Sequence, residues 1–242
     1  MGTRFFEIMT QKNERWVGHQ SEQWMHKVKE HPGVKESRSP FITISREYGC
    51  AGFPLGELLA VEFNKSNEDS LPWAVYDKRL LEKIENDHGI KQALLKSLCD
   101  KTHNEITDFF SSFITSTPSQ SLFYKKIFTT IRALAYQGHT IIIGRGGVVA
   151  SQKISGGFHV RIYAPFDWKV KQIMTMHSIS EKEAQVMLKK VTKEREGYIK
   201  KYFKAEINDP NLYHLMINNA EFPHEEMSEI ILCGLKKKGI YR

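Results

Sequence analysis

One stretch, ITISREYGCAGFP at residues 42–54, has the residue types of a loop that binds phosphate through its main chain. An Ile-containing apolar run precedes small residues, and Pro54 suits the first turn of a following helix. In such a loop, backbone N–H groups surround phosphate oxygens and the helix dipole adds attraction. The candidate nucleotide-binding residues are Ser45, Arg46, Glu47, Tyr48, Gly49, Cys50, Ala51 and Gly52.

The two side chains that usually complete such a loop are missing. In the pattern GxxxxGK[ST], the lysine reaches the outer phosphates and the hydroxyl holds Mg²⁺. Here Gly52 and Phe53 stand at those two positions. Another cation must then meet the phosphates, and Arg46 is the nearest in sequence, which makes it a catalytic candidate. The loop alone leaves open a strand-to-helix turn that binds no ligand.

Two further segments carry charged groups that suit an anionic acceptor. Arg145 follows the apolar run TIIIG, and the planar guanidinium of arginine can bond phosphate through two N–H groups. Asp77 and Lys78 follow the run AVY. Asp77 could orient the acceptor or coordinate Mg²⁺ through water, or it could cap the next helix. Arg145 could instead be a surface residue without a ligand. The segment GRGGVVAS also suggests a dinucleotide-binding motif, but that interpretation fails because Val149 occupies the third glycine position.

A strongly basic helix is predicted from about residue 181. Ser180 and Glu183 have the spacing of a capping box at its start. Its cations are Lys182, Lys189, Lys190, Lys193, Arg195, Lys200, Lys201 and Lys204, and helical spacing places 189, 193, 200 and 204 on one face. Because phosphoryl transfer depends on positioning and on cations at the transferring group, Arg195 and Lys193 are catalytic candidates, with Lys189 as a candidate for binding the acceptor. A solvated basic face is the alternative.

The elements that must position these groups alternate between strand and helix. The predicted strands are FITIS (41–45), AVYD (74–77), TIIIG (140–144), HVRIYA (159–164) and HLMIN (214–218). Mostly continuous apolar runs of this kind are typical of strands buried on both faces of a parallel sheet. Helical patterns lie between them, so we predict a doubly wound α/β fold. Ligands bind at the carboxyl ends of such strands, which is where the charged groups collect.

The composition fits a globular protein that binds anions. The chain has 242 residues, of which 40% are hydrophobic, and a net charge of +7. We expect no membrane span and no secretory signal, because no apolar run is long enough and the start has no cleavage pattern. Three distant cysteines favour a reducing cytoplasm over a disulfide framework or a zinc site, so no metal ligands are assigned. Residues 1–37 are predicted to be a helical extension ending in a linker.

Several motifs, taken in order, resemble the cytidylate kinase-like family of bacteria. ITISREYGCAG resembles the family's opening ITISR-x-Y-G-S-G-G, and AVYDKRLLEKI and IIIGRGG resemble its second strand and its GRG segment. IYAPFDWKVKQIM, KKVTKEREGYIKKYF and NDPNLYHLMINNAEF resemble the segments around its lid. The resemblance spans residues 40 to about 235 and departs from the family at Ala51 and Phe53.

The resemblance implies a three-layer P-loop fold with a five-stranded parallel sheet. It also implies a nucleoside monophosphate kinase-like insertion at about 78–120 and a basic lid at about 180–205, within one domain spanning 38–242. ATP and Mg²⁺ are the implied donor system. The matching arginine of true cytidylate kinases lies in a GRD motif and grips the acceptor's phosphate, and Gly146 replaces the Asp of that motif here.

We therefore expect ATP-dependent phosphoryl transfer to a small anionic acceptor, such as the nucleoside monophosphate CMP. A nucleotide sensor without catalysis, using the same cleft, is the second hypothesis. A nucleic-acid-binding protein that uses the basic helix and the tail GLKKKGIYR ranks last. The sequence names neither the acceptor nor the oligomeric state.

Overall fold

The computed structural model describes residues 39–65, 72–86 and 118–240. The predicted extension at 1–37 and most of the predicted insertion at about 78–120 lie outside the described residues. Within the described ranges, no helix combines the length and the apolar character needed to cross a bilayer.

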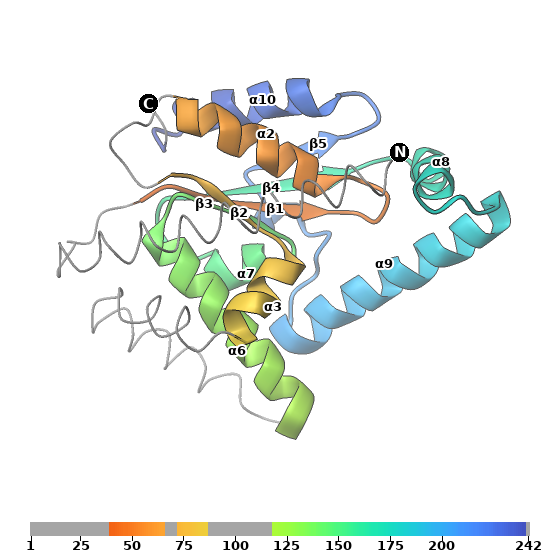
Figure 1. Ribbon diagram of the computed structural model, residues 1–242, viewed down its shortest axis with the longest axis horizontal. Coiled ribbons are helices and arrows are strands. Elements are labelled where there is room, and N and C mark those ends of the chain that lie inside the picture. The colour runs from red at the N-terminus through yellow and green to blue at the C-terminus, as the bar shows by residue number, and fades with distance from the viewer. Residues whose placement is uncertain (1–38, 66–71, 87–117, 241–242) are drawn as a thin grey trace.

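A five-stranded parallel sheet forms the centre of the molecule (Figure 1). Its strands are β1 (Phe41–Arg46), β2 (Ala74–Tyr76), β3 (Thr140–Ile143), β4 (Gly157–Tyr163) and β5 (Leu215–Asn218). All five predicted strands are confirmed, and β1, β3 and β4 are buried along most of their length, as continuous apolar runs require. The parallel doubly wound sheet predicted from the sequence is therefore the one observed.

Helices cover both faces of the sheet and give three layers (Figure 1). One face carries α2 (Gly52–Lys65) and α10 (His224–Lys237), whose apolar residues form a core with β1, β3 and β4. The other carries α3 (Lys78–Asn86), α6 (Pro118–Gln137) and α7 (Gly147–Ser151), which bury a second apolar cluster. The predicted three-layer α/β P-loop fold is confirmed.

Two further helices extend from the carboxyl edge of the sheet (Figure 1). They are α8 (Phe166–His177) and α9 (Glu181–Phe203). The capping box at Ser180 and Glu183 is confirmed, with each residue bonding the backbone of the other. A small apolar cluster joins α8 to the first half of α9, and Ile199 and Phe203 join its second half to the core. One end of α9 is thus held by the body of the protein.

The strand order β2-β3-β1-β4-β5 fixes where a ligand can enter. From β1 the chain runs first to the β2–β3 side and then crosses to the β4–β5 side. The connections that leave β1 and β3 therefore diverge at their carboxyl ends and open a crevice between them. The crevice lies beside the loop after Arg46 and the turn after Ile143.

A pair of stacked histidines predicts acid-sensitive stability. His159 is 3% exposed, bonds Thr43 Oγ1 at 2.8 Å and stacks on His214. Burial, followed by the neighbouring charges of His214 and Lys238, lowers the pKa of His159 to about 4. The unfolded chain binds the proton near pH 6.5, so the stabilisation is complete above that pH and is lost as pH falls toward 4.

We expect the free energy of unfolding to fall by about 2 kcal/mol between pH 7 and pH 5 from His159 alone. The pKa of His214 is lowered as well, mainly by burial, so His214 adds to the loss. Urea unfolding at the two pH values measures the difference. In His159→Gln the difference should shrink, and an unchanged difference in that variant would contradict the assignment.

Candidate functional site

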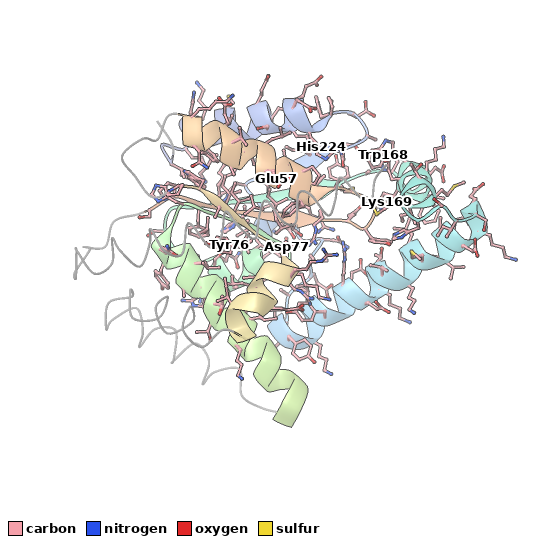
Figure 2. All side chains as sticks on the ribbon, in the orientation of Figure 1. Glu57, Tyr76, Asp77, Trp168, Lys169 and His224 are labelled. Atoms are coloured by element: carbon pink, nitrogen blue, oxygen red, sulfur yellow. The ribbon has the colours of Figure 1, made fainter. Side chains whose placement is uncertain are left out.

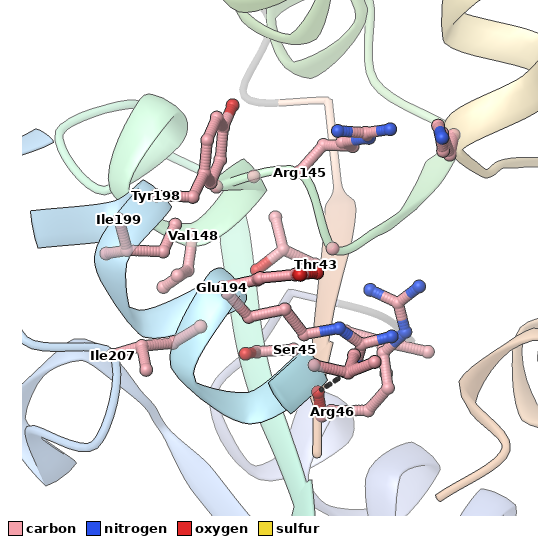
Figure 3. A pocket seen from close by; sticks show the side chains of 16 residues that line it. Thr43, Ser45, Arg46, Arg145, Val148, Glu194, Tyr198, Ile199 and Ile207 are labelled. Carbon is pink, nitrogen blue, oxygen red and sulfur yellow. Dashed lines mark hydrogen bonds between the residues drawn. The ribbon is translucent and has the colours of Figure 1, made fainter. Parts of the chain in front are cut away.

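A cavity of about 410 Å³ occupies the crevice at the carboxyl edge of β1 and β3 (Figure 3). One wall is the end of β1, the second is the turn from β3 into α7, and the third is one face of α9. The lining residues are Thr43, Ile44, Ser45, Arg46, Lys78, Gly144, Arg145, Gly146, Gly147, Val148, Val191, Glu194, Arg195, Tyr198, Ile199 and Ile207. The cavity thus combines a cationic part with an apolar part.

Arg46 lies across two glycines at the floor of this cavity. A Cβ on Gly144 would stand 1.8 Å from Arg46 Nη1, and one on Gly52 would stand 3.3 Å from Arg46 Cδ. Both glycines therefore provide the space that the guanidinium and its stem occupy. Gly52 is the position where a complete phosphate loop carries lysine. The aliphatic stem of Arg46 crosses Gly52, and its guanidinium lies beside Gly144.

The pKa of Arg46 is lowered to about 10. Burial is the largest cause, the positive charge of Arg195 adds to it, Asp77 opposes it, and Arg145 contributes further. Figure 2 places Asp77 at the start of α3. A guanidinium held among like charges gains strongly from an anion, because the anion relieves the repulsion.

Arg195 reaches the same place from α9. Its Nη1 donates to the main-chain oxygen of Arg46 at 3.2 Å, and its guanidinium lies 5.3 Å from the ring centre of Tyr48. The Tyr48 hydroxyl is 2.8 Å from His177 Nε2 and donates to Met187 Sδ at 3.2 Å. Burial is the main cause that lowers the pKa of Arg195. Tyr48 therefore attaches the loop after β1 to α8 and α9.

Arg145 approaches the cavity from the turn after β3. Its backbone is left-handed, with φ at 52°, between Gly144 and Gly146 at 71° and 73°. These conformations place the side chain beside α3, where Nη2 donates to Glu82 Oε1 at 3.2 Å. Lys78 approaches the same carboxylate at 3.9 Å. Arg145 is thus oriented by α3 while lining the cavity.

Together, the structure brings Arg46, Arg145 and Arg195 to one cavity. They come from three segments far apart in the sequence: the end of β1, the β3–α7 turn and α9. Arginine forks bond phosphate oxygens with charge-assisted hydrogen bonds, and their fixed arrangement stabilises charge that develops during transfer. The arrangement can therefore bind a multiply charged anion and stabilise a transferring phosphoryl group.

The rest of the predicted loop is curled but lies outside the cavity lining. Gly49 has a φ of 94°, and a Cβ there would meet the main chain of Lys169 on α8. Glu47 forms an ion pair with the ammonium of Lys169, which Figure 2 shows on α8. Cys50 is buried, and burial raises its pKa to about 12. Among the predicted loop residues, only Ser45 and Arg46 line the cavity; Glu47, Tyr48, Gly49, Cys50, Ala51 and Gly52 do not.

Phe53 packs against the core and does not line the cavity. It stands where a hydroxyl would hold Mg²⁺, so this position offers the metal no ligand. Within the described residues, no group of three or more His, Cys, Asp or Glu side chains is placed to hold a metal ion. The described residues fit the phosphates of ATP through their cations, but they do not supply a set of Mg²⁺ ligands.

The other predicted site residues divide between the cavity and the surface. Lys78 lines the cavity. Asp77 does not line it, but its negative charge raises the pKa of Arg46, which does. Lys189 and Lys193 are exposed on α9, and the face of that helix which lines the cavity carries Val191, Arg195 and other residues. The structure therefore brings Arg195 to the cavity but leaves both lysines outside its lining.

Sequence reasoning missed two charged residues at this edge of the sheet. Glu194 lines the cavity beside Arg195, and Arg161 is a buried cation in β4. The available signal for Arg161 was its position inside the apolar run HVRIYA, because a charge in a strand buried on both faces must have partners. Glu194 stands among many charges on α9, so no pattern distinguished it.

The strand order and the curled loop after β1 define a P-loop fold, and a cavity lined by three arginines lies at the carboxyl edge of its sheet. A model of the cytidylate kinase-like family matches residues 41–221. The chain belongs to the cytidylate kinase-like family. No curated protein gives a significant match.

One of two solved structures that align with the chain shows the same fold. An uncharacterized protein from Eubacterium ventriosum is 22% identical with a TM-score of 0.63, and the alignment covers 82% of this chain and 99% of that one. At that identity the likeness shows the fold alone. A shikimate kinase from Bacteroides thetaiotaomicron aligns over 82% of this chain and 98% of its own, at 13% identity and a TM-score of 0.46, a level of likeness that supports no inference.

Proposed function

We propose that this protein transfers the γ-phosphoryl group of ATP to a small anionic acceptor such as a nucleoside monophosphate, in the cytoplasm. The convergence of Arg46, Arg145 and Arg195 on one cavity supports the proposal. Membership of the cytidylate kinase-like family supports a nucleotide as substrate.

Each arginine has a distinct part in the proposed reaction. Arg46 and the end of β1 hold the donor phosphates, and Arg145 with Lys78 holds the acceptor. An acceptor oxygen forms a bond to the γ-phosphorus while the bond to the β–γ bridging oxygen breaks, so ADP leaves with the electron pair. Arg195, held at the Arg46 carbonyl, neutralises charge on the transferring group. Lys189 and Lys193 contribute long-range positive potential from the exposed side of α9.

A nucleotide sensor without catalysis is the second candidate. The observation that favours it is Phe53, which packs on the core where a metal-binding hydroxyl would stand. A sensor needs the arginines for binding but does not need in-line geometry between donor and acceptor.

Titration of ATP and CMP in the presence of Mg²⁺, followed by an assay for CDP and ADP, separates the two candidates. The proposal predicts binding of both nucleotides below millimolar concentration and formation of the two products in equal amounts. Binding without product would establish the sensor, and absence of binding would exclude both. A steep loss of nucleic-acid affinity with salt would favour the nucleic-acid hypothesis instead.

A further inference from the structure

We propose that Arg161 is a positioning residue that fixes the end of β1 relative to the carboxyl-terminal half of α9. It thereby keeps Arg46 and Arg195 facing the same anion. Its kinetic consequences rest on the proposed function, whereas its effect on the two cavity walls does not.

Arg161 lies in β4, beside the end of β1, and is 4% exposed. Its Nη1 donates to Ser45 Oγ at 3.1 Å, and its Nη2 is 3.6 Å from Glu47 Oε1. A buried guanidinium is costly unless its charge and its N–H groups are matched. These contacts therefore fix the position of the segment that contains Arg46.

The same guanidinium also reaches the segment that follows α9. Its Nη2 donates to Asn208 Oδ1, and Asn208 Nδ2 donates to Glu196 Oε1 at 3.0 Å. Glu196 is the neighbour of Arg195 on α9. Arg161 is thus two hydrogen bonds away from the helix that carries Arg195.

A tyrosine strengthens this connection. The Arg161 guanidinium carbon lies over the ring of Tyr213, 5.7 Å from the ring centre. The Tyr213 hydroxyl donates to the main-chain oxygen of Ile207 at 2.7 Å. The same hydroxyl is 3.3 Å from Ser45 Oγ. Because Ser45 and Ile207 both line the cavity, Arg161 and Tyr213 hold two of its walls together.

The planar fork of arginine is needed for this role. It contacts Ser45, Glu47 and Asn208 in different directions, whereas the single ammonium of lysine cannot span all three. Arg161→Lys keeps the charge beside Glu47 but loses the connection. Asn208→Ala removes an exposed side chain and with it both hydrogen bonds of the link to α9, while Arg161 keeps its contacts with Ser45 and Glu47.

The experiment compares these two variants with Asn211→Ala in the full chain. Asn211 is also exposed and bonds only Asp209 among the described contacts, so it is a matched control. With ATP and CMP, we expect Asn208→Ala and Arg161→Lys to lower kcat by about tenfold or more while KM for ATP stays within about threefold. In the protein without nucleotide, hydrogen exchange in the last turn of α9 should rise at least about fivefold in both variants. Asn211→Ala should change neither quantity.

Unchanged exchange in both Arg161→Lys and Asn208→Ala would overturn the positioning role, whatever the activity. Equal losses in Asn211→Ala would also overturn it, because the effect would then be general destabilisation. If the wild-type protein binds ATP but forms no product, the proposed reaction fails on its own. The exchange result then still decides whether Arg161 joins the two walls.

Discussion

Arg46→Met will lower kcat/KM for ATP by roughly a hundredfold or more while raising the stability of the protein without nucleotide. The guanidinium gives charge-assisted hydrogen bonds of about 1.5–3 kcal/mol each to a bound phosphate, and each ~1.4 kcal/mol is tenfold in rate. Without an anion it is a partly buried charge near Arg195, Asp77 and Arg145, with a pKa that burial lowers. Replacing such a charge by an apolar side chain of similar length is expected to raise the free energy of unfolding by about 1 kcal/mol.

Opposite signs for activity and stability distinguish a binding cation from a structural one. Urea unfolding without nucleotide and steady-state kinetics with ATP measure the two effects. Gly144→Ala disturbs the same contact between Gly144 and Arg46, because the added Cβ would collide with Arg46 Nη1. We expect it to lower activity too, and to lower stability because Gly144 has a φ of 71°. An Arg46→Met protein that is both unstable and fully active when folded would contradict the assignment.

Arg195→Ala will lower turnover by about a thousandfold but weaken ATP binding by less than about tenfold. An arginine that meets the transferring group contributes mainly in the transition state, where its effect reaches several powers of ten. In the proposed reaction Arg195 acts at the junction of donor and acceptor, because its Nη1 is held at the Arg46 carbonyl. A fall in kcat with a nearly constant dissociation constant is the signature of such a group.

The dissociation constant comes from calorimetry with ATP and the turnover number from steady-state kinetics. Lys190→Ala is the matched control, since it removes an exposed cation from the same helix. It should leave both quantities within about twofold. Equal losses of binding and turnover in Arg195→Ala would show that α9 supplies a binding group only.

The fold could be predicted from the sequence because its signals are local. Continuous apolar runs such as TIIIG mark strands buried on both faces, and Ser180 with Glu183 marks a helix start within four residues. Both depend on neighbours in the chain. Each predicted strand lies within two residues of the observed one for the same reason.

The site was harder to predict, because its members meet only through the topology. The sequence indicates Arg46 only because it is the cation nearest in sequence to the missing lysine. Its actual place above Gly52 and Gly144 depends on how β1 and β3 pair. Lys193 and Arg195 were grouped as neighbours on one helix, although only Arg195 turns toward the cavity. Arg161 was missed because its partners, Ser45 and Asn208, are distant in sequence.

A structure of the protein with a non-hydrolysable ATP analogue tests the central claim most directly. We expect the γ-phosphate to lie within hydrogen-bonding distance of Arg46 and Arg195, with the side chain of Arg46 still above Gly52. A triphosphate bound elsewhere, or one whose γ-phosphate meets neither arginine, would contradict it.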